Sequence, residues 1–89
     1  ELTEIEAVKI YPNPSYGHQA IRLAFSAQKQ TQLFMRIYDI NGKLIQHEAI
    51  RVQPGVQEHM IQPKGWAAGI YTIQLVDQGK VRTVKWVIN

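Results

Sequence analysis

Three histidines are the residues best suited to bind a metal or move a proton in this chain of 89 residues. Compact metal sites place their ligands only a few residues apart on a turn, strand or helix. His18, His47 and His59 are far from one another, and none stands beside a suitably spaced pair of carboxylates. His47 and His59 could still meet across paired strands. The favoured interpretation is that all three lie on the surface or at strand edges, so no metal site is predicted.

The sequence also lacks residues in an arrangement suited to covalent or acid–base catalysis. The absence of cysteine excludes disulfides, thiol catalysis and thiolate metal sites. The two serines, Ser15 and Ser26, do not lie in a G-x-S-x-G elbow, and no glycine-rich loop precedes a helical pattern. The seven acidic residues are too dispersed to form a general acid and base pair. We therefore expect no catalytic residue, no cofactor and no enzymatic activity.

Two aromatic residues, Tyr16 and Trp66, stand outside the regular apolar pattern. Exposed aromatic rings can stack on sugars or bases, and Trp66, between Gly65 and two alanines, is the better candidate. A tryptophan in such a segment more often closes one end of a β-sandwich, and we favour that interpretation. The alternative function is an immunoglobulin-like adhesion or carbohydrate-binding module of a secreted protein, which requires both rings to face solvent.

The net charge of +3 is unevenly distributed along the chain. Three glutamates lie in the first six residues, whereas the remainder carries ten Lys or Arg against four acids, a balance of 10 − 4 = +6. The bases form no consecutive run, so nucleic-acid binding is not expected. No apolar run reaches 18 residues, so no transmembrane segment is expected either. We expect residues 1–6 to end a linker from a parent protein and residues 7–89 to form one domain.

Alternation of apolar and polar residues predicts seven short strands. These expected strands cover residues 7–11, 21–25, 33–38, 45–50, 56–62, 71–76 and 83–88. Residues 33–38 carry bulk on both faces and should form a central strand. The side chains expected in the core are those of Ile21, Leu23, Phe25, Leu33, Met35, Ile37, Tyr71, Ile73, Leu75, Val84, Trp86 and Ile88.

Turn signals separate these strands. Asn41-Gly42 predicts a type I′ turn with positive φ at both residues, and Gly79 predicts a short hairpin loop. Pro54-Gly55 fits a type II turn, and residues 63–69 form a longer connection. Such turns every 8–12 residues are typical of a β-sandwich. The predicted fold is an all-β, immunoglobulin-like antiparallel sandwich of about seven strands, with a small closed barrel as the alternative.

Four short motifs follow one another in a specific order. They are I-Y-P-N-P at 10–14, I-Y-D-I-N-G-K at 37–43, G-I-Y at 69–71 and V-K-W-V-I-N at 84–89. The two prolines of the first motif lack N–H donors, so a strand should not run far past Tyr11. The order and spacing of the motifs resemble the C-terminal sorting domain of the type IX secretion system of Bacteroidetes. One departure is Trp66, where the family usually carries leucine.

This resemblance implies that the chain is a C-terminal secretion signal. An outer-membrane translocon would read the folded domain after the parent protein has reached the periplasm, and direct the parent to the outer membrane and cell surface. A surface peptidase of the attachment complex could then remove the domain, and the cargo could be joined to anionic lipopolysaccharide.

A strand that ends the chain could offer its edge to a receptor by strand addition. The candidate residues for translocon recognition are therefore Lys80, Arg82, Lys85, Val87, Ile88 and Asn89. An alternative role for the three bases is to protect that edge from aggregation. A third interpretation, a purely structural spacer, predicts that the domain tolerates cargo at both ends, whereas a sorting signal must be terminal.

Overall fold

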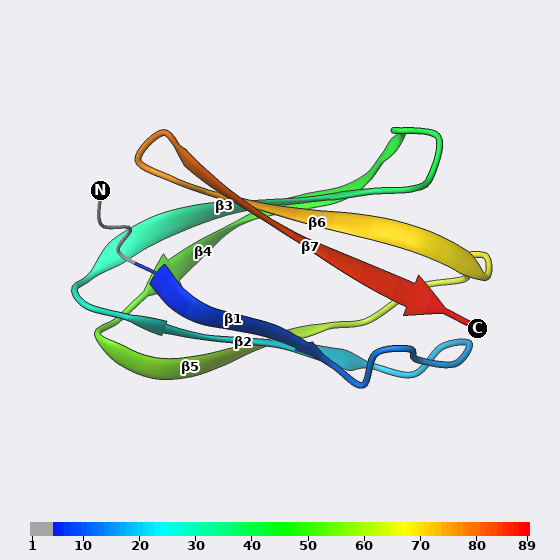
Figure 1. Cartoon of the computed structure of the whole chain (residues 1–89), viewed down its shortest axis with the longest axis horizontal. Helices are drawn as coiled ribbons and strands as arrows, with labels where there is room; N and C mark the ends of the chain where they lie inside the picture. The colour runs from blue at the N-terminus through cyan, green and yellow to red at the C-terminus, as the bar shows by residue number, and fades with distance from the viewer. Residues whose placement is uncertain (1–4) are drawn as a thin grey trace.

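Seven strands in two antiparallel sheets make up the computed structural model, which describes residues 5–89. They are β1 (Ile5–Tyr11), β2 (Ile21–Ala27), β3 (Thr31–Tyr38), β4 (Leu44–Val52), β5 (Gly55–Ile61), β6 (Gly69–Asp77) and β7 (Lys80–Ile88). Figure 1 shows the sheets packed face to face, so the predicted β-sandwich is confirmed. No helix in the described residues is long and apolar enough to cross a membrane.

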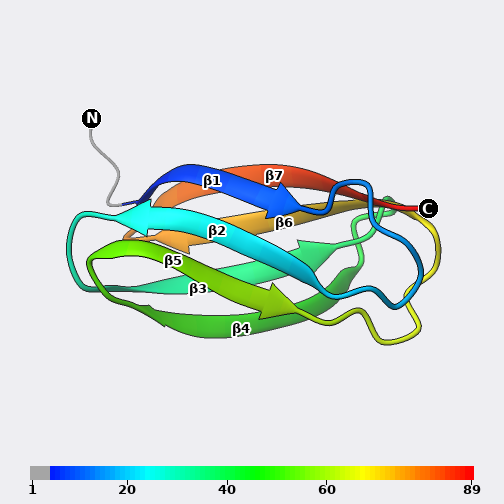
Figure 2. The ribbon, with the colours of Figure 1, turned by 90° about the horizontal axis from the view of Figure 1, so that it is seen from below.

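The strand order explains how the sandwich closes. The smaller sheet has the order β1-β2-β5 and the larger sheet β4-β3-β6-β7, with β3 in a central position as predicted. Immunoglobulin constant domains place their fourth strand in the first sheet. Here β4 pairs with β3 instead, because the short turn at 39–43 joins the two strands as a hairpin. Figure 2 shows β1 and β7 along one side of the sandwich and β5 and β4 along the other.

The core lies between the two sheets and follows the predicted alternation. Eleven of the twelve expected core side chains are buried, and Val84 alone is half-buried. Val84 is on β7, which pairs only with β6, so one flank of this residue has no neighbouring strand. Each fully buried aliphatic or aromatic side chain contributes about 1.5–3 kcal/mol relative to an exposed one. A domain without disulfides therefore depends on this interior layer.

The turn between β3 and β4 differs from its prediction. Gly42 has a φ of 83°, but Asn41 does not adopt positive φ, so a type I′ turn at Asn41-Gly42 is wrong. The N–H of Gly42 donates to the Asp39 carbonyl at 3.0 Å. The Asp39 carboxylate accepts from the N–H groups of Asn41 and Lys43, both at 2.9 Å. This carboxylate holds a wider turn in which only the glycine needs the left-handed region.

The type I′ geometry occurs in the other hairpin instead. Asp77 pairs with Lys80, and the two residues between them, Gln78 and Gly79, have φ values of 51° and 83°. Both central residues of a type I′ turn require positive φ. Gly79 thus has the left-handed conformation that was predicted for it, and the backbone imposes the same conformation on Gln78.

The remaining connections cross between the sheets. Gly55, with a φ of 110°, opens β5 where the chain leaves the larger sheet for the smaller one. The residues after Ile61 return the chain to the larger sheet at Gly69, so the predicted longer crossing is confirmed. Of the expected linker 1–6, residues 1–4 lie outside the described part of the chain. Ile5 and Glu6 belong to β1, and Ile5 is buried in the core.

Candidate functional site

Asn13 joins the first motif to the outer edge of the last strand. Its side-chain amide donates to the Lys85 carbonyl at 3.0 Å and accepts from the Val87 N–H at 3.1 Å. Pro12 and Pro14 on either side have no N–H to offer. The amide of Asn13 therefore pairs with β7 as a peptide group of a neighbouring strand would.

Ser15 completes this contact, and we call residues 13–15 the clasp. The Ser15 N–H donates to the Val87 carbonyl at 2.9 Å, and the Ser15 carbonyl accepts from Asn89 at 2.7 Å. Its hydroxyl accepts from the indole N–H of Trp86 at 2.9 Å, and the residue is fully buried. The sequence analysis considered Ser15 only as a possible nucleophile and assigned it no structural contact. The asparagine between two prolines is the local feature of the clasp, but it does not identify the last strand as the partner.

The clasp corrects the expectation of a freely exposed edge on the last strand. The carbonyls of Lys85 and Val87 and the N–H groups of Val87 and Asn89 are already hydrogen-bonded to residues 13–15. Open edges invite pairing with other chains, and natural proteins cover them. A receptor that used strand addition over Lys85–Asn89 would have to displace the clasp.

The six predicted recognition residues separate into two groups along β7. Lys85 and Asn89 are exposed and Val87 is half-buried, whereas Ile88 is buried in the core. Side chains alternate between the faces of a strand, which explains why neighbours differ so sharply.

Lys80 and Arg82 lie at the beginning of β7, away from its C-terminal end. Both are half-buried, and the Arg82 guanidinium donates to the Ile5 carbonyl at 2.7 Å. Lys80 and Arg82 therefore do not share the C-terminal end of the strand with Lys85, the third base among the predicted recognition residues.

Three aromatic rings close the end of the core behind the clasp. Trp66, Tyr71 and Trp86 have ring centroids 5.5–5.8 Å apart in tilted pairs. The Tyr71 hydroxyl donates to the Ala67 carbonyl at 2.6 Å. Burial, and to a smaller degree the charge of Asp39, raises the pKa of Tyr71 above its ordinary value of 10.0. Trp66 thus packs against the core and closes one end of the sandwich, as the favoured interpretation predicted. The carbohydrate-binding alternative required Trp66 and Tyr16 to face solvent together, and Trp66 does not.

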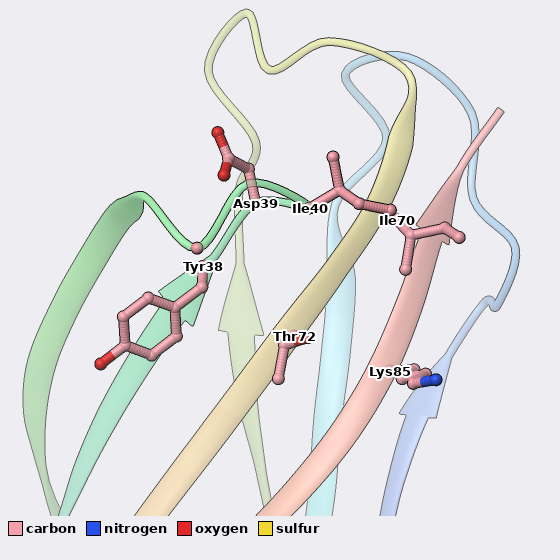
Figure 3. A pocket seen from close by; sticks show the side chains of 7 residues that line it. Tyr38, Asp39, Ile40, Ile70, Thr72 and Lys85 are labelled. Carbon is pink, nitrogen blue, oxygen red and sulfur yellow. The ribbon is translucent and has the colours of Figure 1, made fainter.

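A shallow hollow of about 390 Å³ lies at the same end, on the outer face of the larger sheet (Figure 3). It is lined by Tyr38, Asp39, Ile40, Gly42, Ile70, Thr72 and Lys85. The I-Y-D-I-N-G-K, G-I-Y and V-K-W-V-I-N motifs each contribute to this lining. Ile40 is 69% exposed and Ile70 is 43% exposed, so the rim is apolar and accessible. Sequence reasoning did not select Ile40, because it reads as an ordinary turn residue.

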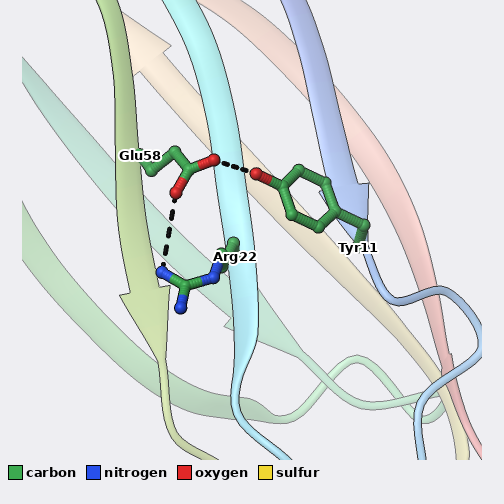
Figure 4. A network of polar contacts seen from close by, with 3 residues as sticks. All are labelled: Tyr11, Arg22 and Glu58. Atoms are coloured by element: carbon green, nitrogen blue, oxygen red, sulfur yellow. Dashed lines mark hydrogen bonds and ion pairs between the residues drawn. The ribbon is translucent and has the colours of Figure 1, made fainter.

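The charged side chains and the histidines considered next make contacts between neighbouring strands or between the two sheets. Figure 4 shows Glu58 on the outer face of the smaller sheet, where it accepts from the Tyr11 hydroxyl and lies 3.5 Å from the Arg22 guanidinium. His59 faces Glu48 at 3.1 Å, whereas His47 lies outward beside Arg36, so the two histidines do not meet. Residues 5–89 contain no cluster of three potential metal ligands.

Comparison with solved structures agrees with the β-sandwich fold. A solved structure of a β-glucosidase from Erythrobacter marinus contains a similar fold, with a TM-score of 0.67 and 12% identity. The similarity covers 96% of this chain and only 15% of that enzyme, and at this identity it concerns the fold alone. No curated protein matches the sequence.

The family comparison covers nearly the whole chain. A family profile described as the secretion system C-terminal sorting domain matches residues 9–89, from β1 to the end of the chain. That match includes all four motifs, the clasp and every residue that lines the hollow. The chain therefore belongs to the secretion system C-terminal sorting domain family and is a sorting signal for type IX secretion.

Proposed function

We propose that the type IX translocon reads the end of the sandwich where the hollow meets the C-terminal part of β7. One observation carries this proposal: three sequence motifs that are far apart in the chain converge on the lining of a single hollow. The hollow offers apolar side chains at its rim and the exposed Lys85 beside them. Apolar contact surrounded by polar groups is the usual composition of a protein-binding patch.

Within this proposal, Lys85, Val87 and Asn89 touch the receptor from the last strand. Ile88 acts indirectly, because its burial fixes the position of its two neighbours. A role for Lys80 and Arg82 stays a prediction from the sequence. The contact of Arg82 with Ile5 supports a structural role for that residue instead.

The hollow can be tested with matched pairs of exposed substitutions. A Sec-exported reporter carrying this domain at its C-terminus would be expressed in a bacterium with a type IX system. Ile40→Ser removes apolar surface from the rim, and Val56→Ser removes it from the other sheet, where Val56 is 83% exposed. We expect Ile40→Ser to lower the amount of surface reporter and Val56→Ser to leave it unchanged.

The charge at Lys85 has its own control. Lys85→Glu and Lys64→Glu make the same charge change at exposed positions, and each should alter the stability by less than about 0.5 kcal/mol. Retention in the periplasm is expected for Lys85→Glu only. Equal export of both variants, together with normal export of Ile40→Ser, would rule out this end of the sandwich as the surface that is read.

We further propose that the domain acts by binding and that a surface peptidase separates it from its cargo. The Ser15 hydroxyl is buried and accepts from the Trp86 indole N–H, which supports a structural role for this serine. The family resemblance supports removal of the domain and attachment of the cargo to anionic lipopolysaccharide. Mass spectrometry of surface-exposed cargo should then find the parent without residues 5–89 and with an added glycolipid.

A further inference from the structure

On the outer face of the larger sheet, the strands carry bases but no acids. Its outward positions are the even-numbered residues from Gln32 to Tyr38 of β3 and their cross-strand partners on β4, β6 and β7. Three of these positions hold a base: Arg36, Arg51 and Lys85. Every other outward position on the four strands is apolar or carries no formal charge at neutral pH.

No acid of the larger sheet occupies an outward position on its strands. Asp77 is buried and accepts from the Thr31 hydroxyl at 2.9 Å, and Glu48 faces His59 at the rim of the sandwich. Asp39 stands in the turn at the end of the sheet, where it lines the hollow and two backbone N–H groups donate to its carboxylate. The uncompensated positive charge of the outer face therefore follows from how the acids are placed.

The smaller sheet provides an internal comparison. Its outer face carries both signs, with Glu58 beside Arg22 and with Lys9 directly across Ala24 from that glutamate. A mixed surface of this kind exerts little net field, whereas charges of one sign on one face attract an oppositely charged partner. The two faces of the sandwich thus differ in electrostatic character.

Apolar side chains lie between the bases of the larger sheet. Phe34, Val76 and Val81 are cross-strand neighbours on β3, β6 and β7, and Phe34 and Val81 are about half exposed. The hollow with Ile40 and Ile70 adds a second apolar area at the end of the sheet, beyond the polar row of Arg36, Gln74 and Thr83. Arginine next to exposed aromatic and aliphatic groups is typical of protein interfaces rather than of a surface that only binds anionic sugars.

We propose that the outer face of the larger sheet docks an acidic protein surface of the translocon. This proposal rests on the proposed function and extends the contact from the hollow along all four strands. Positive charge would speed the encounter and set the orientation, and the apolar rows would supply the contact area. A second copy of this chain is a poorer occupant, because two such faces would repel each other.

Charge reversal on this face is the first test. Arg36→Glu combined with Arg51→Glu changes two exposed bases, and Lys9→Glu combined with Lys64→Glu makes the same change elsewhere. With both variants shown to be folded by circular dichroism, we expect surface export of the reporter to fall about tenfold or more for the first pair only. Equal export of both pairs would overturn the docking proposal. Failure of the unaltered domain to export the reporter would instead refute the sorting mechanism itself in that cell.

Photo-crosslinking in secreting cells identifies what covers the face. A benzophenone amino acid would replace Thr83, which is exposed on the outer face of β7, or Val56, which is exposed on the other sheet. A protease-sensitive adduct of Thr83 with a protein of the secretion system, absent at Val56 and weakened by Arg36→Glu with Arg51→Glu, would support the proposal. Adducts with lipopolysaccharide, adducts of twice the chain mass, or no adduct at Thr83 would overturn it.

Discussion

At the scale of single residues, Ser15 and Trp86 connect the segment after β1 to the last strand. The indole N–H of Trp86 lies inside the core and has the Ser15 hydroxyl as its acceptor. A buried donor without a partner carries a desolvation penalty that an exposed one does not. This contact explains why a small polar residue is fully buried directly after Pro14.

Ser15→Ala should destabilise the domain by about 1–3 kcal/mol, because it leaves the Trp86 N–H unpaired. Urea unfolding followed by tryptophan fluorescence would measure the change. Ser26→Ala is the matched control, since the Ser26 hydroxyl makes only a long, exposed contact of 3.4 Å with the Glu6 carbonyl. Equal midpoints for the two variants would mean that Trp86 finds another acceptor.

Tyr71 should make the stability of the domain depend on alkaline pH. Burial raises the pKa of this phenol in the folded state above 10.0, so the unfolded chain loses the proton first. The stabilising effect is therefore complete below about pH 10 and is lost as the pH rises through the folded pKa. Urea midpoints between pH 8 and 11 should fall for the unaltered domain and fall less for Tyr71→Phe. Parallel curves for the two proteins would contradict this role.

At the scale of elements, the two hairpins differ in how well their turn residues suit the backbone conformation of the turn. Gln78 has a φ of 51°, a region that asparagine tolerates better than glutamine. Gln78→Asn creates the Asn-Gly pair that type I′ turns prefer and should stabilise the domain by about 0.5 kcal/mol. Thermal unfolding would measure the gain. Gln30→Asn, at an exposed position outside the left-handed region, should bring none.

The elements also show what a sequence can and cannot predict here. Alternation identified all seven strands, because one face of each strand must enter the core. It did not identify the turn at Asn41, where the Asp39 carboxylate selects a wider geometry than the Asn-Gly pair alone suggests. The clasp was missed for a related reason. The partners of Asn13 are more than 70 residues away in the sequence, and no local pattern reports such a contact.

The hollow shows the same limit. Its motifs were visible as separate short segments, but only the pairing of β3, β6 and β7 brings Tyr38, Thr72 and Lys85 into one row. Sequence reasoning therefore selected Lys85 and overlooked Ile40, which reaches the same rim from a turn.

At the scale of the whole molecule, folding and recognition depend on the same strand and need to be separated. A domain of this size has a total stability of roughly 5–10 kcal/mol. Ile88→Ala should remove about 2–5 kcal/mol of it, because Ile88 is buried in the core. We expect a large fall in the urea midpoint and loss of export together. Lys85→Glu should lose export while its midpoint stays near that of the unaltered domain, and a variant pair that behaves alike in both measurements would contradict the separation.

The direction of the first and last strands has a further consequence for a protein that carries cargo. The clasp pairs with the last strand in parallel, and Figure 2 shows β1 and β7 running the same way, so β1 begins at the end of the sandwich opposite Asn89. The long axis of the domain measures 35 Å. If a parent protein joined the domain at β1, its cargo would therefore begin about one domain length away from the hollow. Such spacing would let cargoes of very different size leave the same surface accessible.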